Sequence, residues 1–396
     1  METQTQFYRD TWVEINLDDL KHNVTSIKKH LPQDVHMFAV VKANAYGHGD
    51  IQVAKTALEN GAHGLAVAFL DEALALRRNG IDAPILVLGA TRPENVKLAC
   101  ENKISLTVFY YDWLKEARKF LNVDDLLNLH VKCDTGMGRI GVREVEDLKM
   151  IEEYINTQSN FVFEGLFTHF ATADELDESY YRKQLKTFLE LKNSLEIPPK
   201  YIHSANSAAT LRFAESHFNS VRVGISMYGL SPSIEIKDRL PFELKQVFSL
   251  HSRLSLVKKL SEGEKVSYGA TYETSQEEWI GTIPIGYADG WLRKLQGQEI
   301  LVNNKRAPII GRICMDQCMV KLSEEIPLGE KVTLIGSQGE GFISMDEVAK
   351  RLDTINYEIP CIISNRVPRI YIQNEKPIEV SNKLLVSSDF LKNHVE

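Results

Sequence analysis

The sequence contains little cysteine and no long hydrophobic run. Its cysteines are odd in number and scattered, which favours free thiols over a disulfide framework; they are Cys100, Cys133, Cys314, Cys318 and Cys361. No cluster of histidine or cysteine lies near Cys314 and Cys318 to complete a zinc site, so we expect no bound metal. The longest apolar runs, such as Leu65 to Leu70, are far too short to span a bilayer. Because Met1 to Asp10 also lacks the apolar segment of a signal peptide, we expect a cytoplasmic protein without membrane contact.

The chain also lacks an excess of positive charge. It has 46 Lys and Arg against 54 Asp and Glu, a net charge of −8, so nucleic acid and anionic membranes are not expected partners. The 43% of hydrophobic and 25% of charged residues are close to the average of globular proteins, which excludes fibrous and disordered classes. A length of 396 residues predicts two or three domains.

Short apolar runs alternate with amphipathic stretches from about residue 37 to residue 230. The runs are Met37–Val41, Gly64–Ala68, Pro84–Gly89, Ile104–Phe109, Leu127–Cys133, Phe161–Phe167, Tyr201–Ser204 and Val221–Gly224. Helical patterns lie between them, for example at Asp71–Asn79, Tyr111–Phe120, Glu144–Ile155 and Tyr180–Leu195. Such runs are typical of parallel strands buried between helices, and about eight strand–helix units predict a (β/α)8 TIM barrel over residues 1–240. An open doubly wound sheet is the alternative, which the lack of a G-x-G-x-x-G turn after the first run disfavours.

After Pro241 the pattern changes to alternating strand-like segments, which predicts a mainly β domain over residues 241–396. The segments are Leu250–Leu260, Ile280–Gly286, Glu299–Val302, Ala307–Ile313, Cys318–Leu322 and Lys331–Ile335. One clear helix is predicted at Met345–Leu352, with Ser344 and Glu347 as a capping box. The segment Trp12–Leu17 also alternates, and the β domain is a possible place for this strand instead of the barrel.

Lys42 ends the first apolar run, and active sites of barrels lie at the carboxyl ends of their strands. A lysine in a buried position loses hydration and its pKa falls readily, as a lysine that forms a Schiff base requires. On position alone, a lysine that reaches the rim of the barrel to keep its charge in water fits equally well.

The ends of the seventh and eighth runs favour the covalent role for Lys42. Asn206 and Ser207 precede a helical stretch, and Gly224 and Ile225 follow the eighth run. Barrels bind phosphate at this place, on backbone N–H groups and a helix N-terminus. A lysine together with a phosphate site suggests pyridoxal 5'-phosphate.

Four stretches of the chain resemble the signature sequences of bacterial alanine racemases. They are Ala39–Gly49, Lys132–Gly141, Arg222–Ile225 and Gly311–Gln317. The resemblance implies a barrel followed by a β domain, and a pyridoxal-phosphate-dependent isomerase that interconverts L-alanine and D-alanine and supplies D-alanine for peptidoglycan. It implies that Lys42 holds the cofactor aldehyde and that Tyr46, Ser207, Gly224, Ile225 and Tyr357 bind the phosphate, while His169, Asn206 and Arg222 complete the cofactor site.

Racemisation requires a proton carrier on each face of the reacting carbon. Lys42 can serve one face. By resemblance Tyr268, in the stretch Val266–Gly269, serves the other and reaches the site from the partner subunit, which implies a homodimer with shared active sites. Without the resemblance, a tyrosine between Ser267 and Gly269 is more often an ordinary strand or turn residue.

Arg222 resembles the residue that faces the pyridine nitrogen of the cofactor. An arginine cannot accept a proton and makes the cofactor a weaker electron sink, which favours racemisation over transamination. His169 resembles the residue that links Arg222 to Tyr268, although a lone histidine is more often a satisfied polar group.

The remaining residues concern the substrate. By resemblance, Arg139 and the backbone N–H of Met315 hold the substrate carboxylate, and Tyr287 and Tyr357 line a narrow entrance that suits a methyl side chain. Asp316 follows in the same motif with no clear role beyond a surface contact. Lys132 lies near Arg139, and many family members carbamylate this lysine, so we predict the same modification here.

Three other functions share parts of this pattern. Pyridoxal-dependent decarboxylases of basic amino acids have the same architecture, but the cysteine–glutamate–serine–glycine–aspartate stretch that they carry is absent from this sequence. A non-catalytic pyridoxal-phosphate-binding protein would lack the β domain. A broad-specificity amino-acid racemase would keep both proton carriers and differ only in pocket width.

Overall fold

The computed structural model describes residues 7–385, which divide into two compact units. The barrel unit comprises Asp19–Ala45 and Asp50–Lys245. The β unit comprises the described residues up to Asp18, the short segment Tyr46–Gly49, and the chain from Gln246 onward. The two units are described separately below.

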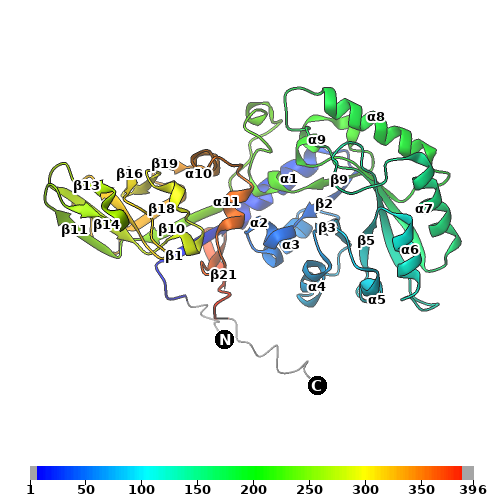
Figure 1. Ribbon diagram of the computed structural model, residues 1–396, viewed down its shortest axis with the longest axis horizontal. Helices are drawn as coiled ribbons and strands as arrows, with labels where there is room; N and C mark the ends of the chain where they lie inside the picture. Colours follow the sequence, from blue (N-terminus) through cyan, green and yellow to red (C-terminus); the bar gives the residue numbers. More distant parts are fainter. Residues whose placement is uncertain (1–6, 386–396) are drawn as a thin grey trace, which may run out of the picture. The chain divides into compact units, whose positions relative to one another are not determined.

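Eight parallel strands form the centre of the barrel unit, in the order β8-β7-β6-β5-β4-β3-β2-β9. They are β2 (His36–Val40), β3 (Gly64–Val67), β4 (Ile85–Val87), β5 (Ile104–Val108), β6 (Leu127–Lys132), β7 (Phe161–Phe167), β8 (Tyr201–His203) and β9 (Ser220–Val223). The backbone N–H of Arg222 in β9 donates to the carbonyl of Ala205 just after β8, at 3.0 Å, which nearly closes the sheet. Each of the eight predicted runs is a strand, and the predicted barrel is confirmed (Figure 1).

Helices alternate with the strands along the chain and cover the outside of the sheet (Figure 1). They are α1 (Leu17–His30), α3 (Asp50–Glu59), α4 (Leu70–Arg78), α5 (Val96–Glu101), α6 (Tyr111–Arg118), α7 (Val145–Thr157), α8 (Ser179–Ser194) and α9 (Ser207–Arg212). In α7 the buried apolar side chains are Leu148, Ile151 and Ile155, spaced three and four apart on one face. This spacing is the reason why the pattern could be recognised in the sequence.

The β unit contains an eleven-stranded sheet in its described residues, with the order β11-β14-β17-β16-β15-β18-β10-β1-β20-β21 and β19 paired to β18. Its strands are β1 (Thr11–Asn16), β10 (Phe248–Arg253), β11 (Leu256–Leu260), β14 (Glu278–Ile283), β15 (Glu299–Val302), β16 (Lys305–Ile310), β17 (Cys318–Leu322), β18 (Lys331–Gln338), β19 (Gly341–Ile343), β20 (Arg369–Gln373) and β21 (Lys376–Ser381). β1 pairs antiparallel with β10 and parallel with β20, although it precedes the whole barrel in sequence. The mainly β character expected after the barrel is confirmed.

Three details of the β unit differ from the sequence-based expectation. The segment Leu250–Leu260 was predicted as one strand but forms the two strands β10 and β11. The backbone changes hydrogen-bond partners between them, because Leu254 N–H donates to the carbonyl of Glu330 and Ser255 N–H to the carbonyl of Thr282. The pattern did not reveal the short pair β12 (Lys265–Val266) and β13 (Tyr272–Glu273), nor β19, β20 and β21. It also missed the short helix α11 (Glu358–Ile362).

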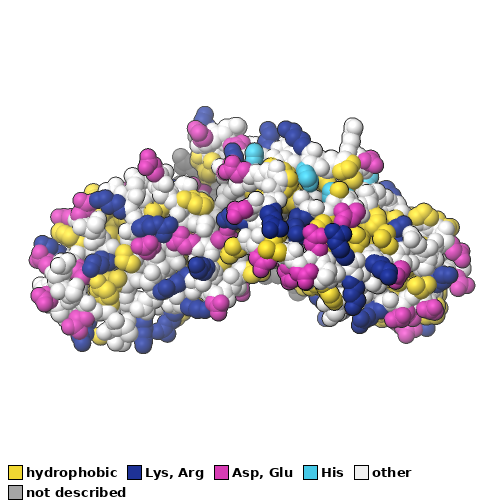
Figure 2. Space-filling model, turned by 90° about the horizontal axis from the view of Figure 1, so that it is seen from above, with side chains coloured by type: hydrophobic (Ala, Val, Ile, Leu, Met, Phe, Trp, Pro, Cys, Tyr) yellow, Lys and Arg dark blue, Asp and Glu magenta, His cyan; other side chains and the backbone are white. Residues whose placement is uncertain are grey.

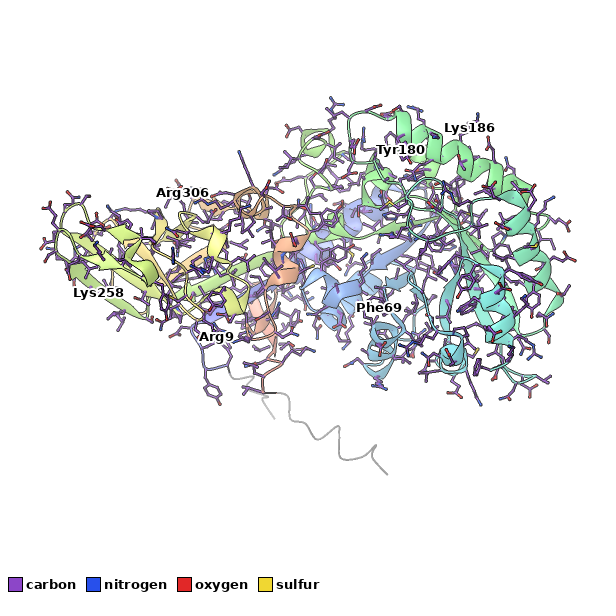
Figure 3. The ribbon with its side chains drawn as sticks, in the orientation of Figure 1. Arg9, Phe69, Tyr180, Lys186, Lys258 and Arg306 are labelled. Carbon is purple, nitrogen blue, oxygen red and sulfur yellow. The ribbon has the colours of Figure 1, made fainter. Side chains whose placement is uncertain are left out.

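The predicted capping box is half correct. The helix α10 (Met345–Leu352) begins as expected, with the Ser344 hydroxyl accepting a hydrogen bond from Glu347 N–H at 3.0 Å. The Glu347 carboxylate does not return to Ser344 and instead binds Arg306 and Gln298. A guanidinium with two N–H donors is a stronger partner for a carboxylate than one backbone N–H. Arg306 is labelled in Figure 3.

The surface carries both charges. Acidic and basic side chains are interspersed over the face shown in Figure 2. No helix between residues 7 and 385 is both long enough and apolar enough to span a membrane.

Candidate active site

The predicted site residues of the barrel unit lie at the carboxyl ends of its strands. Lys42 follows β2, Lys132 ends β6, His169 follows β7, Asn206 and Ser207 follow β8, Arg222 lies in β9, and Gly224 and Ile225 follow it. Because the carboxyl ends of parallel strands meet at one end of a barrel, these residues gather there.

A strained turn follows Lys42. Ala43, Asn44, Ala45 and Tyr46 all have left-handed backbone angles, with φ between 51° and 54°. This conformation costs roughly 1–2 kcal/mol for each residue with a side chain, and such strain persists only where surrounding contacts fix it. Gly47 continues the turn with φ of 82°, and a Cβ at this position would lie 2.0 Å from the carbonyl oxygen of Pro360.

Glu72 in α4 holds this turn in place. One carboxylate oxygen accepts a hydrogen bond from Ala43 N–H at 2.7 Å, and the other accepts from Ala68 N–H at 2.7 Å and Phe69 N–H at 3.2 Å. The exposed ring of Phe69 is labelled in Figure 3. Glu72 thereby joins the residue after Lys42 to the end of the neighbouring strand. The sequence-based analysis missed Glu72, since nothing in its local pattern distinguishes it from a solvated residue in the first turn of a helix.

Arg222 is 3% exposed and makes five hydrogen bonds, all from its two terminal nitrogens. Nη1 donates to Nδ1 and to the carbonyl of His203, at 2.8 and 2.9 Å. Nη2 donates to the carbonyl of Thr168 at 2.7 Å and lies 3.4 Å from Nδ1 of His169. Within residues 7–385 no group accepts a hydrogen bond from Nε, so this edge of the guanidinium is left for a ligand. Burial, and to a lesser extent the charge of Arg139, lowers the pKa of Arg222 to about 9.

Lys132 is surrounded by positive charge. It is 4% exposed, and its pKa falls to about 7, first because of burial and then because of Arg139, Arg222 and Lys42, while Asp134 acts in the opposite direction. Burial holds the pKa of His169 well below its usual range, and the positive charges of Arg222, Arg139, Lys132 and Lys42 act in the same direction. An imidazole at this place is therefore neutral.

The loop that carries Arg139 is fixed by its own hydrogen bonds. Asp134 accepts from the backbone N–H groups of Gly136 and Gly138, at 3.1 and 2.9 Å. The hydroxyl of Tyr180, labelled in Figure 3, donates to the carbonyl of Gly136 at 2.8 Å. Arg139 itself is exposed.

The hydroxyl of Ser207 connects the two segments of the predicted phosphate site. The Ser207 Oγ accepts a hydrogen bond from Gly224 N–H at 2.9 Å and so joins the start of α9 to the end of β9. Asn206 caps α9, with its side chain accepting from Ala209 N–H at 3.0 Å. Ile225 begins a short 3₁₀ turn, η3 (Ile225–Tyr228).

Two further phosphate-site candidates are neighbours in the β unit. The rings of Tyr46 and Tyr357 lie 6.2 Å apart, centre to centre. Burial, and to a lesser extent Cys361, raises the pKa of the Tyr46 phenol well above its usual range. Tyr46 is therefore a neutral hydroxyl that can donate a hydrogen bond.

The other predicted residues of the β unit share one exposed region. Tyr268 begins a short turn, η5 (Tyr268–Ala270), and its neighbour Ser267 donates to the carbonyl of Arg312 at 2.5 Å and contacts Cys314 at 3.6 Å. In turn, Tyr287 N–H donates to the carbonyl of Cys314 at 3.1 Å, and Ala288 N–H to that of Met315 at 3.1 Å. Tyr268 is 71% exposed, Met315 52% and Tyr287 39%.

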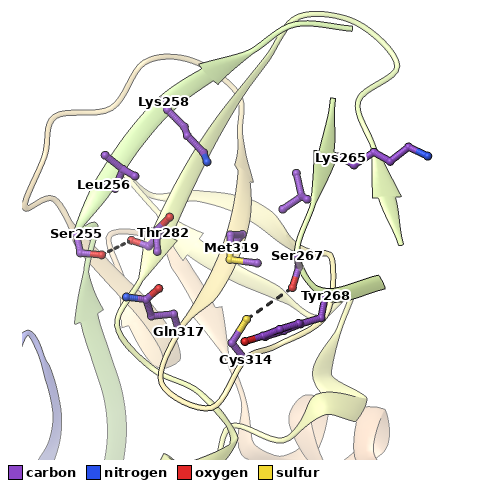
Figure 4. A pocket seen from close by; sticks show the side chains of 11 residues that line it. Ser255, Leu256, Lys258, Lys265, Ser267, Tyr268, Thr282, Cys314, Gln317 and Met319 are labelled. Carbon is purple, nitrogen blue, oxygen red and sulfur yellow. Dashed lines mark hydrogen bonds between the residues drawn. The ribbon is translucent and has the colours of Figure 1, made fainter. Parts of the chain in front are cut away.

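An open pocket of about 710 Å³ adjoins Tyr268 (Figure 4). Its lining includes Leu256, Tyr268, Cys314 and Met319. Asp316 points to a different partner, since it forms an ion pair with Arg366 at 2.7 Å. This is the ordinary surface contact that the sequence left open for Asp316.

Comparison with known proteins identifies the chain. The family model described as alanine racemase, N-terminal domain, matches residues 15–232, and the one described as alanine racemase, C-terminal domain, matches residues 247–371. The chain belongs to the alanine racemase family. It is 60% identical to the alanine racemase of Geobacillus kaustophilus over 377 residues, which cover 95% of this chain and 98% of the relative.

Solved structures of racemases agree with this assignment. The crystal structure of the alanine racemase from Bacillus anthracis with bound L-Ala-P has a TM-score of 0.93 and 55% identity, covering 96% of this chain and 99% of that one. A histidine racemase from Leuconostoc mesenteroides subsp. sake is 32% identical with a TM-score of 0.88, covering 93% and 99%. The chain is thus an alanine racemase, an isomerase of a family that uses pyridoxal phosphate. This assignment excludes the two alternatives of a decarboxylase and a non-catalytic binding protein.

Proposed function

We propose that this racemase holds pyridoxal 5'-phosphate on Lys42 and moves the Cα proton of alanine between two carriers, Lys42 and Tyr268. The observation that carries the proposal is the position of Lys42, on a strained turn at the barrel end where Arg222 offers a free Nε–H. When bound, the cofactor withdraws electrons from Cα and makes its proton acidic. The residues around it decide where that proton goes.

The donor groups fit the cofactor. A phosphate needs N–H and O–H donors. In the barrel unit these are the Ser207 hydroxyl, which Gly224 N–H holds in place, and Ile225 N–H, while Asn206 fixes the start of α9. In the β unit the neutral phenol of Tyr46, beside Tyr357, is a donor of the same kind. At the ring nitrogen, Arg222 would donate a hydrogen bond from Nε and could not accept a proton. This limits electron withdrawal and favours immediate return of the proton to Cα. His169 holds Nη2 of Arg222 from the side.

The two carriers act on opposite faces of the substrate. Lys42 Nζ takes the proton from D-alanine and Tyr268 Oη takes it from L-alanine, and each returns a proton in the reverse direction. We propose that Tyr268 and Met315 come from the partner subunit of a homodimer. Their high exposure in the single chain supports this, because a catalytic tyrosine must be shielded from water when it works.

The substrate is held by its carboxylate. We propose that Arg139 and the backbone N–H of Met315 bind it, and that Tyr287 and Tyr357 line the entrance and leave room for a methyl group. D-Alanine made in this way would supply peptidoglycan, and the cytoplasmic location stays a prediction from the sequence.

Trapping of the cofactor tests the proposal. The purified protein is reduced with borohydride, digested and mapped by mass spectrometry, and the cofactor is expected on Lys42. Lys42→Ala should lose this adduct and nearly all interconversion of alanine, whereas Lys55→Ala, an exposed lysine of α3, should keep both. A Lys42→Ala enzyme that still carries a borohydride-stable adduct and racemises alanine would refute the assignment.

A broader racemase is the second candidate, because a histidine racemase shares this fold. Incubation with single L-amino acids and chiral chromatography of the products separates the two. We expect alanine to be converted far faster than any amino acid with a larger side chain. Comparable rates for large side chains would establish the broader specificity.

A further inference from the structure

A chain of hydrogen bonds runs from Arg222 through the interior of the barrel unit. Arg222 Nη1 lies 2.8 Å from Nδ1 of His203, Nε2 of His203 lies 2.8 Å from Nδ1 of His130, and Nε2 of His130 lies 3.1 Å from a carboxylate oxygen of Glu164. The hydroxyl of Ser105 donates to the same oxygen at 2.6 Å. His130 and His203 are 1% and 0% exposed, so no bulk water substitutes for these partners.

Only one arrangement of protons satisfies every link while both rings are neutral. Arg222 can only donate, so Nδ1 of His203 must accept and its proton must sit on Nε2. That proton is donated to Nδ1 of His130, whose own proton must therefore sit on Nε2 and point at Glu164. Glu164, as an ionised carboxylate, accepts it. The guanidinium and the carboxylate at the two ends thus impose one tautomer on both histidines.

The barrel is built locally to place Glu164 in this chain. The register between β6 and β7 shifts so that Leu129 pairs with Phe163 and His130 with Gly165, which leaves Glu164 as the extra residue of a β-bulge. Bulges redirect a side chain. The next residue is glycine for a related reason: a Cβ on Gly165 would lie 2.3 Å from Nδ1 of His130, the atom that accepts from His203.

Aromatic rings hold the two imidazoles in place. The ring of Phe167 is stacked on His203, 4.8 Å away at 5°, and that of Tyr201 is stacked on His130, 5.8 Å away at 20°. Burial lowers the pKa of both histidines, which keeps them neutral although His130 contacts a carboxylate. Burial raises the pKa of Glu164, but its hydrogen bonds with His130 and Ser105 outweigh this, and the pKa lies below its usual value.

Arg222 needs this support because no carboxylate in residues 7–385 forms an ion pair with it, although its guanidinium is buried. We propose that Glu164 is a positioning residue for Arg222: through His130 and His203 it supplies the countercharge and fixes the orientation of the guanidinium. The proposal rests on the proposed function only in that Arg222 faces the ring nitrogen of the cofactor.

Neutron diffraction from a deuterated crystal of the holoenzyme, grown near neutral pH, tests the chain without any activity measurement. We expect deuterium on Nε2 of both His130 and His203 and on neither Nδ1. Deuterium on Nδ1 of His203, or on both nitrogens of either ring, would overturn the proposal.

Glu164→Gln tests the role of the charge, because the amide oxygen can still accept from His130. Glu152→Gln is the matched control, since Glu152 is another buried carboxylate of the same unit, with Glu196 and Ile197 N–H as partners and no link to Arg222. In the holoenzyme we expect Glu164→Gln to lower kcat about tenfold, because it removes a charge that only two imidazoles separate from Arg222 in a partly screened interior. The KM for alanine should stay within about twofold and Glu152→Gln should leave kcat unchanged, since only Glu164 acts through Arg222.

Equal kcat values for Glu164→Gln and Glu152→Gln, at equal thermal stability, would contradict the positioning role. If the wild-type enzyme did not racemise alanine, the proposed function would fail, and the neutron result would still decide the proton arrangement by itself.

Discussion

The carboxylate of Glu72 accepts a hydrogen bond from the backbone N–H of Ala43 at 2.7 Å. Ala43 is the first of four consecutive left-handed residues after Lys42, so this contact sits where the strain begins. Glu72 also binds two N–H groups at the end of β3, which makes it a bridge between neighbouring strand ends. The position of the lysine therefore depends on a side chain 30 residues away that need not touch the cofactor.

Glu72→Ala should loosen this turn and weaken cofactor binding. A hydrogen bond to a charged group contributes about 1.5–3 kcal/mol, and about 1.4 kcal/mol corresponds to a factor of ten in Kd. We expect the Kd for pyridoxal phosphate, measured by quenching of protein fluorescence, to rise at least about tenfold. Asp71→Ala is the control, because Asp71 is an exposed residue of the same helix. If both variants bind the cofactor equally well, Glu72 does not hold the turn.

Lys132 should be carbamylated. Its pKa of about 7 means that much of the amine is uncharged at neutral pH and can attack carbon dioxide. The resulting anion would be stabilised by the same cations, Arg139, Arg222 and Lys42, that lower this pKa. A carbamate resonance is expected by carbon-13 NMR of the enzyme in labelled bicarbonate, and it should be missing in Lys132→Met. Electron density for an unmodified Lys132 at ample bicarbonate would remove the prediction.

Without carbon dioxide, Lys132 should make stability depend on pH. The pKa is about 7 in the folded protein and 10.5 in the reference state, so between these pH values the unfolded chain binds more protons. The contribution of Lys132 to the free energy of unfolding therefore rises with pH over this interval, and the cost of burying the charged amine is fully present below pH 7.

Lys132→Met removes this contribution while keeping an apolar chain of similar length. In bicarbonate-free buffer, we expect urea unfolding at a series of pH values to give a flatter curve for the variant from pH 7 to 10.5, the interval between the two pKa values. The variant should also be the more stable protein below pH 7. Parallel curves for the two proteins would show that Lys132 is not strained by burial.

The barrel was predictable because its strands are short, largely apolar runs that alternate with amphipathic stretches. Gly64–Val67, for example, is buried along its whole length, and such a strand stands out from the amphipathic helix that follows it. The edge of the β unit was not predictable in this way. In β21 four of the six residues of Lys376–Ser381 are exposed, so no apolar alternation marks this strand.

Only part of the candidate site was predictable from the sequence. Lys42, Arg222 and Ser207 could be proposed from their places at strand ends and from the family resemblance. Glu72, His130 and Glu164 could not, because their roles depend on contacts between residues far apart in sequence, and in the case of Glu164 on a bulge that changes the direction of one side chain. A histidine in a strand looks the same in sequence whether its ring is part of a hydrogen-bonded chain or packed in the core.

Tyr268→Phe tests the two-carrier mechanism. Because the enantiomers of alanine have equal free energy, any loss of racemisation appears equally in kcat/KM for both directions. Steady-state rates therefore cannot show which face has lost its carrier. Exchange of the Cα proton with deuterated solvent can show it, since each face exchanges through its own carrier.

With Tyr268 replaced and Lys42 intact, D-alanine should still exchange its Cα proton, whereas L-alanine should not. Assistance by a general acid or base contributes roughly 10² to 10⁴ in rate, so racemisation should fall by at least the lower figure. Tyr110→Phe, a half-exposed tyrosine of the barrel unit, is the control for loss of a hydroxyl and should behave like wild type. The exchange is followed by NMR. An enzyme that has lost the only carrier on one face cannot exchange a proton from that face. If L-alanine exchanges as fast as D-alanine in Tyr268→Phe, or if racemisation stays within about tenfold of wild type, the second carrier is therefore another group.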